Sequence, residues 1–144
     1  MSARRRVVVT GLGIVCPVGN DVQSAWQQLL AGTSGITRIT RFDASTYRAQ
    51  IAGEVKGFDV SRYVSAKEVR RMDTFIHYGV AASVQAVQDS GLQITDDNRD
   101  RIGCIVGSGI GGLPLIEENH SEVVNRGPRR ISPFLIPGAI INMI

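Results

Sequence analysis

Two apolar runs constrain the fold of this chain more than any other feature. RVVVTGLGIV covers residues 6–15, and RIGCIV covers residues 101–106. Neither run alternates apolar with polar residues, so each is typical of a strand that is covered on both faces. Each leads into a turn that contains glycine and then into a sequence that can form a helix. This alternation predicts an α/β fold with a largely parallel sheet.

The first helix is predicted to begin just after the first run. Asn20 or Asp21 can cap it, and Gly32 supplies its stop. Its apolar residues form one stripe, at positions 22, 25, 26, 29 and 30. Residues 33–50 are polar and rich in turn formers, so we expect a loop there. The sequence AQIAGEVKGF at 49–58 is expected to form a short edge strand or one arm of a hairpin.

Two more helices are predicted in the middle of the chain. Ser65 and Glu68 have the spacing of a capping box, which indicates that a short helix starts there. A longer helix from about Asp73 to Ser90 has small and apolar residues around its circumference, which indicates packing on more than one side. His77 in this helix has no second ligand nearby in the sequence. We therefore expect it to be packed or hydrogen-bonded rather than catalytic.

The last part of the chain is predicted to contain two helices separated by RGPRR. The first follows the second apolar run and its glycine turn and extends to about Asn125. The other starts near Pro137 and would be cut after about two turns. The sequence therefore looks truncated at Ile144.

The turn GSGIGG at 107–112 fits the spacing G-x-G-x-x-G of a nucleotide-binding turn. A dinucleotide-binding fold should open with this unit and hold an acidic residue about 20 residues further on, whereas this chain has no acid after Glu122. No Gly-Lys-Ser/Thr follows, which excludes a P-loop. A nucleotide-binding module stays open as an alternative, and close approach of the backbone is the simpler explanation for the glycines.

The charge of the chain is mild but unevenly distributed. The net charge is +3, and the arginines at 126, 129 and 130 follow the last acidic residue, Glu122. A local basic patch of this kind can attract an acidic partner. The sequence lacks a nucleic-acid-binding motif, so we expect no nucleic-acid partner.

The apolar and cysteine content points to a cytoplasmic protein. Hydrophobic residues make up 43% of the sequence and charged residues 20%, as in a soluble globular domain. The sequence has no apolar run long enough to span a bilayer, and we expect no membrane partner. Cys16 and Cys104 belong to no metal-binding pattern and are expected to be buried free thiols. No metal and no cofactor are expected.

Six blocks of sequence together resemble the N-terminal part of the elongating β-ketoacyl-[acyl-carrier-protein] synthases, class II. These blocks are VVVTGLGIVCPVGN, AGTSGI, RRMDTFIHYGVAASVQAVQDSGL, RIGCIVGSGIGGL, IEENH and GPRRISPFLIPGAIINM. The resemblance covers residues 1–144 and implies a single domain, the N-terminal half of a thiolase-like fold truncated before its nucleophile segment. The complete fold would have two similar halves in five α/β/α/β/α layers and would form a homodimer.

The resemblance also implies a chemistry, namely fatty-acid chain elongation. An acyl thioester condenses with malonyl-acyl carrier protein in a decarboxylative Claisen reaction that uses one cysteine nucleophile and two histidines. The resemblance places all three beyond Ile144. Cys16 and Cys104 do not match the nucleophile, and His77 and His120 do not match the histidines. We therefore expect no catalytic residue in this chain, and no activity from it alone.

The resemblance assigns substrate-binding roles to three residues. Ile110, in the glycine turn, would project into the acyl-chain pocket, and Leu135 and Ile136 would reach across the dimer interface toward the acyl pocket of the partner. The family commonly has Phe where this chain has Leu135. The smaller side chain should leave more room at the pocket floor, so the preferred chain length is left open.

The resemblance also assigns a docking face for the acidic acyl carrier protein. The matching basic residues are Lys67, Arg70, Arg71, Arg129 and Arg130. Charge complementarity of this kind mainly raises the association rate. The alternative is that these residues are ordinary solvated surface charges.

Two expectations complete the interpretation. The chain could instead belong to a non-catalytic partner subunit, which shapes chain length while another chain supplies the cysteine. In either case residues 1–144 alone should leave apolar surface uncovered, so we expect them to aggregate or remain molten.

Overall fold

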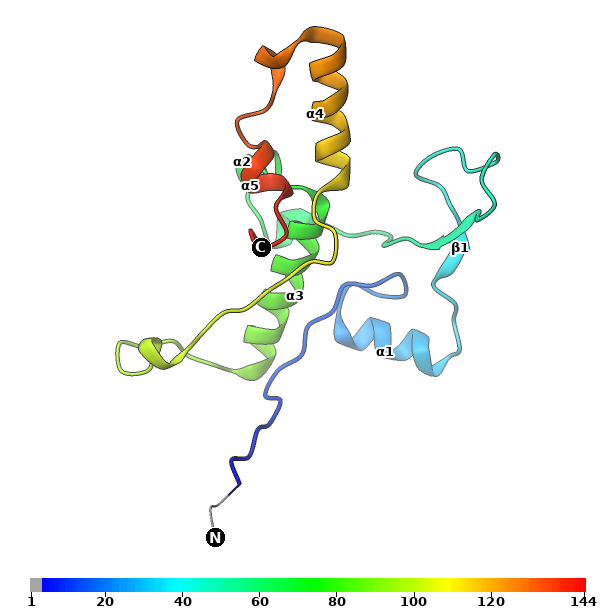
Figure 1. The fold of residues 1–144 in the computed structure, drawn as a ribbon. Coiled ribbons are helices and arrows are strands. Elements are labelled where there is room, and N and C mark those ends of the chain that lie inside the picture. The colour runs from blue at the N-terminus through cyan, green and yellow to red at the C-terminus, as the bar shows by residue number, and fades with distance from the viewer. Residues whose placement is uncertain (1–3) are drawn as a thin grey trace. The chain divides into compact units, whose positions relative to one another are not determined.

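The computed structural model describes residues 4–144, which form two compact units. Unit 1 comprises the described residues up to Phe58 together with Ala82–Gln93, and unit 2 comprises Asp59–Ala81 and Ile94–Ile144. Helix α3 (Thr74–Ser90) is common to both, since its start belongs to unit 2 and its end to unit 1. Figure 1 traces the chain through these elements.

Unit 1 contains helix α1 (Val22–Leu30), which begins and ends as the sequence predicts. The Asp21 carboxylate caps it by accepting a hydrogen bond from the N–H of Ser24 at 2.8 Å. Gly32, just past its end, has a φ of +69°. Of the apolar stripe only Ala25 is buried. An apolar groove of about 300 Å³ separates this helix from residues 12–14, and Trp26 on its wall is 59% exposed.

A two-stranded antiparallel hairpin follows α1 in unit 1. Strand β1 (Ile36–Arg38) pairs with strand β2 (Ile51–Gly53), so that Ile36 lies opposite Gly53 and Arg38 opposite Ile51. The prediction of a hairpin arm at 49–58 is confirmed. The prediction of a continuous loop at 33–50 is wrong in its first part, because the β-branched residues of β1 find a partner strand in β2.

The N-terminal segment of unit 1 lies against the end of α3 without forming a strand. The backbone N–H of Leu12 donates to the Asp89 carboxylate at 2.8 Å, and that of Ile14 donates to Gln85 Oε1 at 3.2 Å. A Cβ at Gly11 would overlap the carbonyl oxygen of Ala86. The glycines of TGLG therefore allow the segment to approach the helix backbone closely.

The predicted parallel sheet does not form within residues 4–144, where β1 and β2 make the one sheet observed. Neither apolar run forms a strand, and several of their side chains are exposed: 94% for Val7, 78% for Val9 and 100% for Ile105. A strand is defined by hydrogen bonds to a neighbouring strand. Runs that are apolar on both faces need covering layers as well as a partner strand.

Unit 2 contains the start of α3 and six further helical elements. Its buried apolar residues include Val64, Ile76 and Ala81, of which Ile76 is 1% exposed. The elements besides α3 are η1 (Val60–Arg62), α2 (Ala66–Val69), η2 (Arg99–Arg101), α4 (Leu113–Arg126), η3 (Pro128–Arg130) and α5 (Leu135–Ala139).

Most of the predicted helices of unit 2 are confirmed. Ser65 caps α2, since its hydroxyl donates to the Glu68 carboxylate at 2.8 Å and accepts from the Glu68 N–H. Helix α4 ends at Arg126, close to the predicted end. Helix α5 begins at Leu135 rather than near Pro137, because proline is tolerated inside the first turn of a helix.

Three single-residue expectations can be checked as well. His77 is buried, as predicted, and its Nε2 has no hydrogen-bond partner among the described residues. Both cysteines are free, but neither is buried: Cys16 is half-buried and Cys104 is exposed. The prediction of burial is wrong for Cys104 because the apolar run that contains it has no neighbouring strand or covering layer in this structure.

Candidate functional site

All the residues with a predicted substrate or docking role lie in unit 2. Ile110 lies in the glycine turn before α4, and Leu135 and Ile136 form the start of α5. The basic residues lie on α2, directly after it, and on η3, namely Lys67, Arg70, Arg71, Arg129 and Arg130. The candidate site therefore comprises segments at both ends of α4: the glycine turn, α2 and α5 near its N-terminus, and η3 just past its C-terminus.

Asp73, 8% exposed, connects three of these segments. Its carboxylate accepts hydrogen bonds from the N–H of Thr74, at 2.6 Å, and from the N–H of Leu115 in the first turn of α4, at 2.9 Å. Its own N–H donates to the carbonyl of Gly138 in α5 at 3.3 Å. Sequence reasoning placed Asp73 at the start of a helix and missed its bonds to α4 and α5.

The glycine turn is joined directly to α5. The N–H of Gly112 donates to the carbonyl of Ala139 at 3.0 Å, and the N–H of Gly111 donates to Ser108 Oγ at 3.1 Å. These two N–H groups are therefore already used within the chain. Since the Asp73 carboxylate lies beside the turn, this turn is poorly suited to hold a phosphate.

The predicted substrate residues differ in exposure. Ile110 is 68% exposed and Ile136 is 63% exposed, whereas Leu135 is partly buried. The hydrogen bond between Gly112 and Ala139 brings the two segments together through their backbones. Their apolar side chains are thus available for contact with an apolar ligand or a second protein surface.

Asn119 fixes the segment that connects η3 to α5. It is 6% exposed, donates from Nδ2 to the carbonyl of Leu115 at 2.8 Å, and accepts at Oδ1 from the N–H of Ser132 at 2.8 Å. The Ser132 hydroxyl in turn accepts from the N–H of Phe134 at 3.1 Å. One buried amide therefore holds the segment that follows the basic turn (η3, with Arg129 and Arg130) against α4. The sequence carried no local signal for this role.

The predicted docking residues occupy different surroundings. Arg70 and Arg130 line a polar cavity of about 360 Å³ beside α4, which also contains the ion pair of Arg126 with Glu122 at 3.3 Å. Lys67 and Arg129 are exposed. The full lining of the cavity is Arg70, Leu115, Glu118, Asn119, Glu122, Arg126, Arg130 and Ser132.

Arg71 is the one docking residue that the structure holds against another side chain by a cation–π contact. Its Cζ lies 4.7 Å from the centroid of the Phe134 ring. A second cavity, of about 290 Å³, lies beside this pair and is lined by Glu68, Arg71, Met72, Phe134, Pro137 and Met143. Arg71 is therefore partly committed to packing beside α5.

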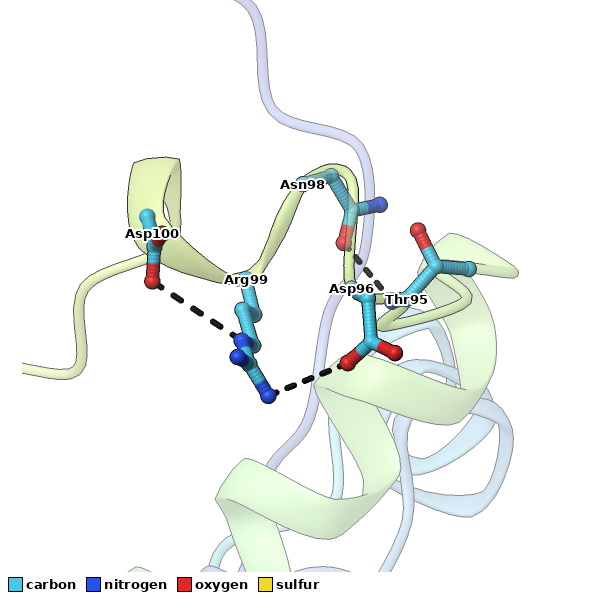
Figure 2. A network of polar contacts seen from close by, with 5 residues as sticks. All are labelled: Thr95, Asp96, Asn98, Arg99 and Asp100. Atoms are coloured by element: carbon cyan, nitrogen blue, oxygen red, sulfur yellow. Dashed lines mark hydrogen bonds and ion pairs between the residues drawn. The ribbon is translucent and has the colours of Figure 1, made fainter.

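A separate polar network precedes the second apolar run and is shown in Figure 2. Arg99 pairs with Asp96 at 3.0 Å and approaches Asp100 at 3.9 Å, while Asn98 accepts from the N–H of Thr95 at 2.8 Å. The acidic side chains are more than nine-tenths exposed, and exposed pairs of this kind contribute about 0–1 kcal/mol. The network shapes a surface turn and is not a candidate site.

None of the helices in residues 4–144 is long and apolar enough to cross a membrane. Among the same residues, no cluster of three or more His, Cys, Asp or Glu side chains could hold a metal ion.

Comparison with known proteins identifies one family. Residues 4–144 match the family model described as beta-ketoacyl synthase, N-terminal domain. The chain is 54% identical over 142 residues to 3-oxoacyl-[acyl-carrier-protein] synthase 2 of Vibrio cholerae, and 46% identical over 143 residues to that of Staphylococcus aureus. Each alignment covers 99% of this chain and 34% of the relative. The chain thus spans about a third of the length of these curated relatives.

Solved structures similar to this chain are also ketosynthases. The ishigamide ketosynthase/chain length factor matches with a TM-score of 0.77 and 32% identity, over 96% of this chain and 34% of that chain. A second match, with a TM-score of 0.77 and 27% identity, is to a structure of a type II polyketide synthase acyl-carrier protein in complex with its ketosynthase bound to the hexaketide. It covers 96% of this chain and 37% of that chain.

Proposed function

The chain belongs to the β-ketoacyl synthase family, through that family's N-terminal domain, and we propose that it supplies the acyl-pocket and carrier-docking part of a 3-oxoacyl-[acyl-carrier-protein] synthase. The fold is the N-terminal half of a thiolase-like ketosynthase. The reaction of the full-length protein would be fatty-acid chain elongation. An enzyme-bound acyl thioester and malonyl-acyl carrier protein would give 3-oxoacyl-carrier protein, carbon dioxide and the free enzyme thiol.

The observation that carries this proposal is the bond between the glycine turn and α5. The Gly112 N–H to Ala139 carbonyl bond places the segment of Ile110 beside the segment of Leu135 and Ile136. An acyl chain needs apolar side chains that converge from different segments. These three are apolar and at least partly exposed, which fits Ile110 to the pocket of its own subunit and Leu135 and Ile136 to the pocket of the partner subunit.

The partner proposed for the basic residues is acidic acyl carrier protein. A solved ketosynthase related to this chain binds an acyl-carrier protein. Arg70 and Arg130 line one cavity. Lys67 on α2 and Arg129 on η3, which lie close to them in the sequence, are exposed. Several cations on neighbouring segments would attract an acidic helix and orient it.

The proposed assembly is a homodimer in the cytoplasm. The family resemblance places Leu135 and Ile136 at the dimer interface, and the 63% exposure of Ile136 is consistent with an apolar contact made by a second copy. No catalytic residue is proposed in residues 1–144. The nucleophile and the two histidines would come from elsewhere in the full-length protein.

A condensation assay tests the proposed function. The full-length protein that contains residues 1–144 would be incubated with acyl-carrier protein and malonyl-carrier protein, and 3-oxoacyl product and carbon dioxide would be measured. Formation of both is expected. Absence of both, from folded protein and at every acyl length, would contradict the proposed reaction.

A second function has one observation in its favour. A related structure is that of a ketosynthase/chain length factor, so a non-catalytic partner subunit is compatible with this fold. The residue at the nucleophile position of the full-length protein separates the two. A cysteine there supports the synthase, and any other residue supports the partner subunit.

A further inference from the structure

We infer that Asp73 is a positioning residue for acyl-chain selectivity, an inference that rests on the proposed function. Asp73 is a buried carboxylate that bears none of the substrate or docking roles described above. Its bonds reach the start of α3, the start of α4 and the end of α5. Those are the segments that carry or adjoin Ile110, Leu135 and Ile136.

The contact between Asp73 and the glycine turn leaves no spare room. A Cβ built on Gly112 would lie 2.7 Å from Asp73 Oδ2 and 3.0 Å from the Cα of Ala139. A Cβ on Gly111, whose φ is +85°, would lie 2.5 Å from the Ala139 carbonyl oxygen. By contrast, a Cβ on Gly107 or Gly109 would meet no atom within 4 Å. The end of the turn is therefore clamped between Asp73 and α5, and its beginning is open.

Ile110 lies immediately before the clamped part of the turn. Its backbone position is therefore set by where Gly111 and Gly112 are held, although Asp73 does not belong to the pocket itself. The same carboxylate holds the N–H of Leu115, which fixes α4, and the Asp73 N–H holds Gly138, which fixes α5. One side chain thus holds both the segment of Ile110, proposed to line the pocket of its own subunit, and the segment of Leu135 and Ile136, proposed to line the pocket of the partner subunit.

The chemistry of the side chain explains why aspartate suits this position. Two separate N–H groups, those of Thr74 and Leu115, each need an acceptor, and a carboxylate supplies two acceptor oxygens. Asparagine has nearly the same shape but only one acceptor oxygen. In Asp73→Asn one N–H group would face an amide N–H group, so the link to α4 or to α3 would be lost.

The test compares long and short acyl substrates in the full-length protein. In Asp73→Asn the first turn of α4 and the end of the glycine turn before it are held less firmly, so the Ile110 side chain should shift and widen the pocket. We expect the kcat/KM ratio of a long to a short acyl-carrier substrate to rise about tenfold, the lower end of the effect of one methylene in an apolar pocket. Gly112→Ala, which pushes the turn away from the same carboxylate, should shift the ratio in the same direction.

Asp59→Asn is the matched control. Asp59 caps η1 in the same unit by accepting from the N–H and hydroxyl of Ser61, and it has no recorded bond to the turn. Its substitution should leave the ratio unchanged. An unchanged ratio in both Asp73→Asn and Gly112→Ala would overturn the inference, as would a uniform loss of activity at all lengths or failure of both variants to fold. A wild-type protein without condensation activity would instead overturn the proposed function.

Discussion

The guanidinium of Arg71 lies 4.7 Å from the centre of the Phe134 ring, so a residue of the predicted docking face packs beside the segment predicted to contact substrate. The neighbouring Arg70 lines a polar cavity instead. Two adjacent arginines of the same charge therefore serve different purposes. Arg71 ties α2 to the start of α5, whereas Arg70 presents its charge to solvent or to a partner.

This difference predicts unequal effects on stability. Arg71→Ala should lower the free energy of unfolding of the full-length protein by about 1 kcal/mol, the usual range of a cation–π contact at a partly exposed site. Arg70→Ala should change it by less. Urea denaturation of the two variants measures the comparison, and equal midpoints would argue against a stabilising role for the contact.

Charge reversal tests the docking face. The double variant Arg129→Glu, Arg130→Glu should weaken binding of acyl carrier protein, most strongly at low salt, because salt screens exposed charges. Titration of carrier protein at two ionic strengths measures this effect. The double variant Arg99→Glu, Arg101→Glu is a control of equal charge change, since both residues lie on η2 and Arg99 pairs locally with Asp96 (Figure 2). Unchanged affinity of the double variant at low salt would contradict the docking role.

The size of residue 135 should influence product length. If Leu135 contacts the acyl chain as proposed, the larger side chain of Leu135→Phe should fill space at the pocket floor and shorten the longest acyl chain accepted. Chromatography of the products formed from a series of acyl-carrier substrates measures this limit. Val124→Phe, at a 68% exposed position of α4, is the control. A product profile identical to that of the wild type would remove Leu135 from the pocket.

The hydrogen bonds of Glu54 should make the stability of the β1–β2 hairpin sensitive to acid. Its carboxylate accepts from Thr40 Oγ1 at 2.7 Å and from the Thr40 N–H, and these hydrogen bonds hold its pKa below the ordinary value of 4.5. A lowered folded-state pKa means that this stabilisation is complete above the unfolded value and is lost as the pH falls through the folded value. The stability difference between wild type and Glu54→Gln should therefore shrink below about pH 4.5.

Denaturation at a series of acidic pH values measures that difference. Asp43 and Asp59 also have lowered pKa values through hydrogen bonds to Ser45 and Ser61, so both proteins should lose some stability in acid. The comparison isolates Glu54 because the two proteins share those groups. A difference that stays constant from neutral to acid pH would contradict the assigned role of Glu54.

The isolated chain should be a poor folding unit. Val7, Val8 and Val9 of the first apolar run and Ile105 of the second are largely or fully exposed, and so much uncovered apolar surface favours association. Residues 1–144 expressed alone should aggregate or lack a cooperative thermal transition. A soluble monomer with a sharp calorimetric transition would show that this expectation is wrong.

The helices of this chain could be predicted because their signals are local. Asp21, Ser65 and Glu68 each mark a helix start within one turn of the chain, and the structure places helices there. Of the strand predictions, the hairpin arm at 49–58 is confirmed, whereas the parallel strands are not, since strand formation depends on partners distant in sequence. Residues 6–15 carry a strong strand pattern and still have no neighbouring strand in this structure.

The candidate site was predictable only in part, for the same reason. Family resemblance assigned roles to Ile110 and to the basic residues, whereas the residues that hold them in place were missed. Asp73 bonds to a residue 42 positions away, and Asn119 to one 13 positions away. No periodicity or spacing within one helix encodes such contacts, so they emerge only from the folded chain.

The Asn119 side chain also makes the basic turn dependent on the chemical lifetime of a single amide. It must donate to the Leu115 carbonyl at one end and accept from Ser132 at the other. Hydrolysis to aspartate would keep the shape but replace the donor with an oxygen that repels the carbonyl. Spontaneous deamidation during ageing or heating, to which asparagine is prone, would therefore remove the bond that orients this side chain within α4, bury a charge there, and weaken its hold on Ser132 without any change in the gene.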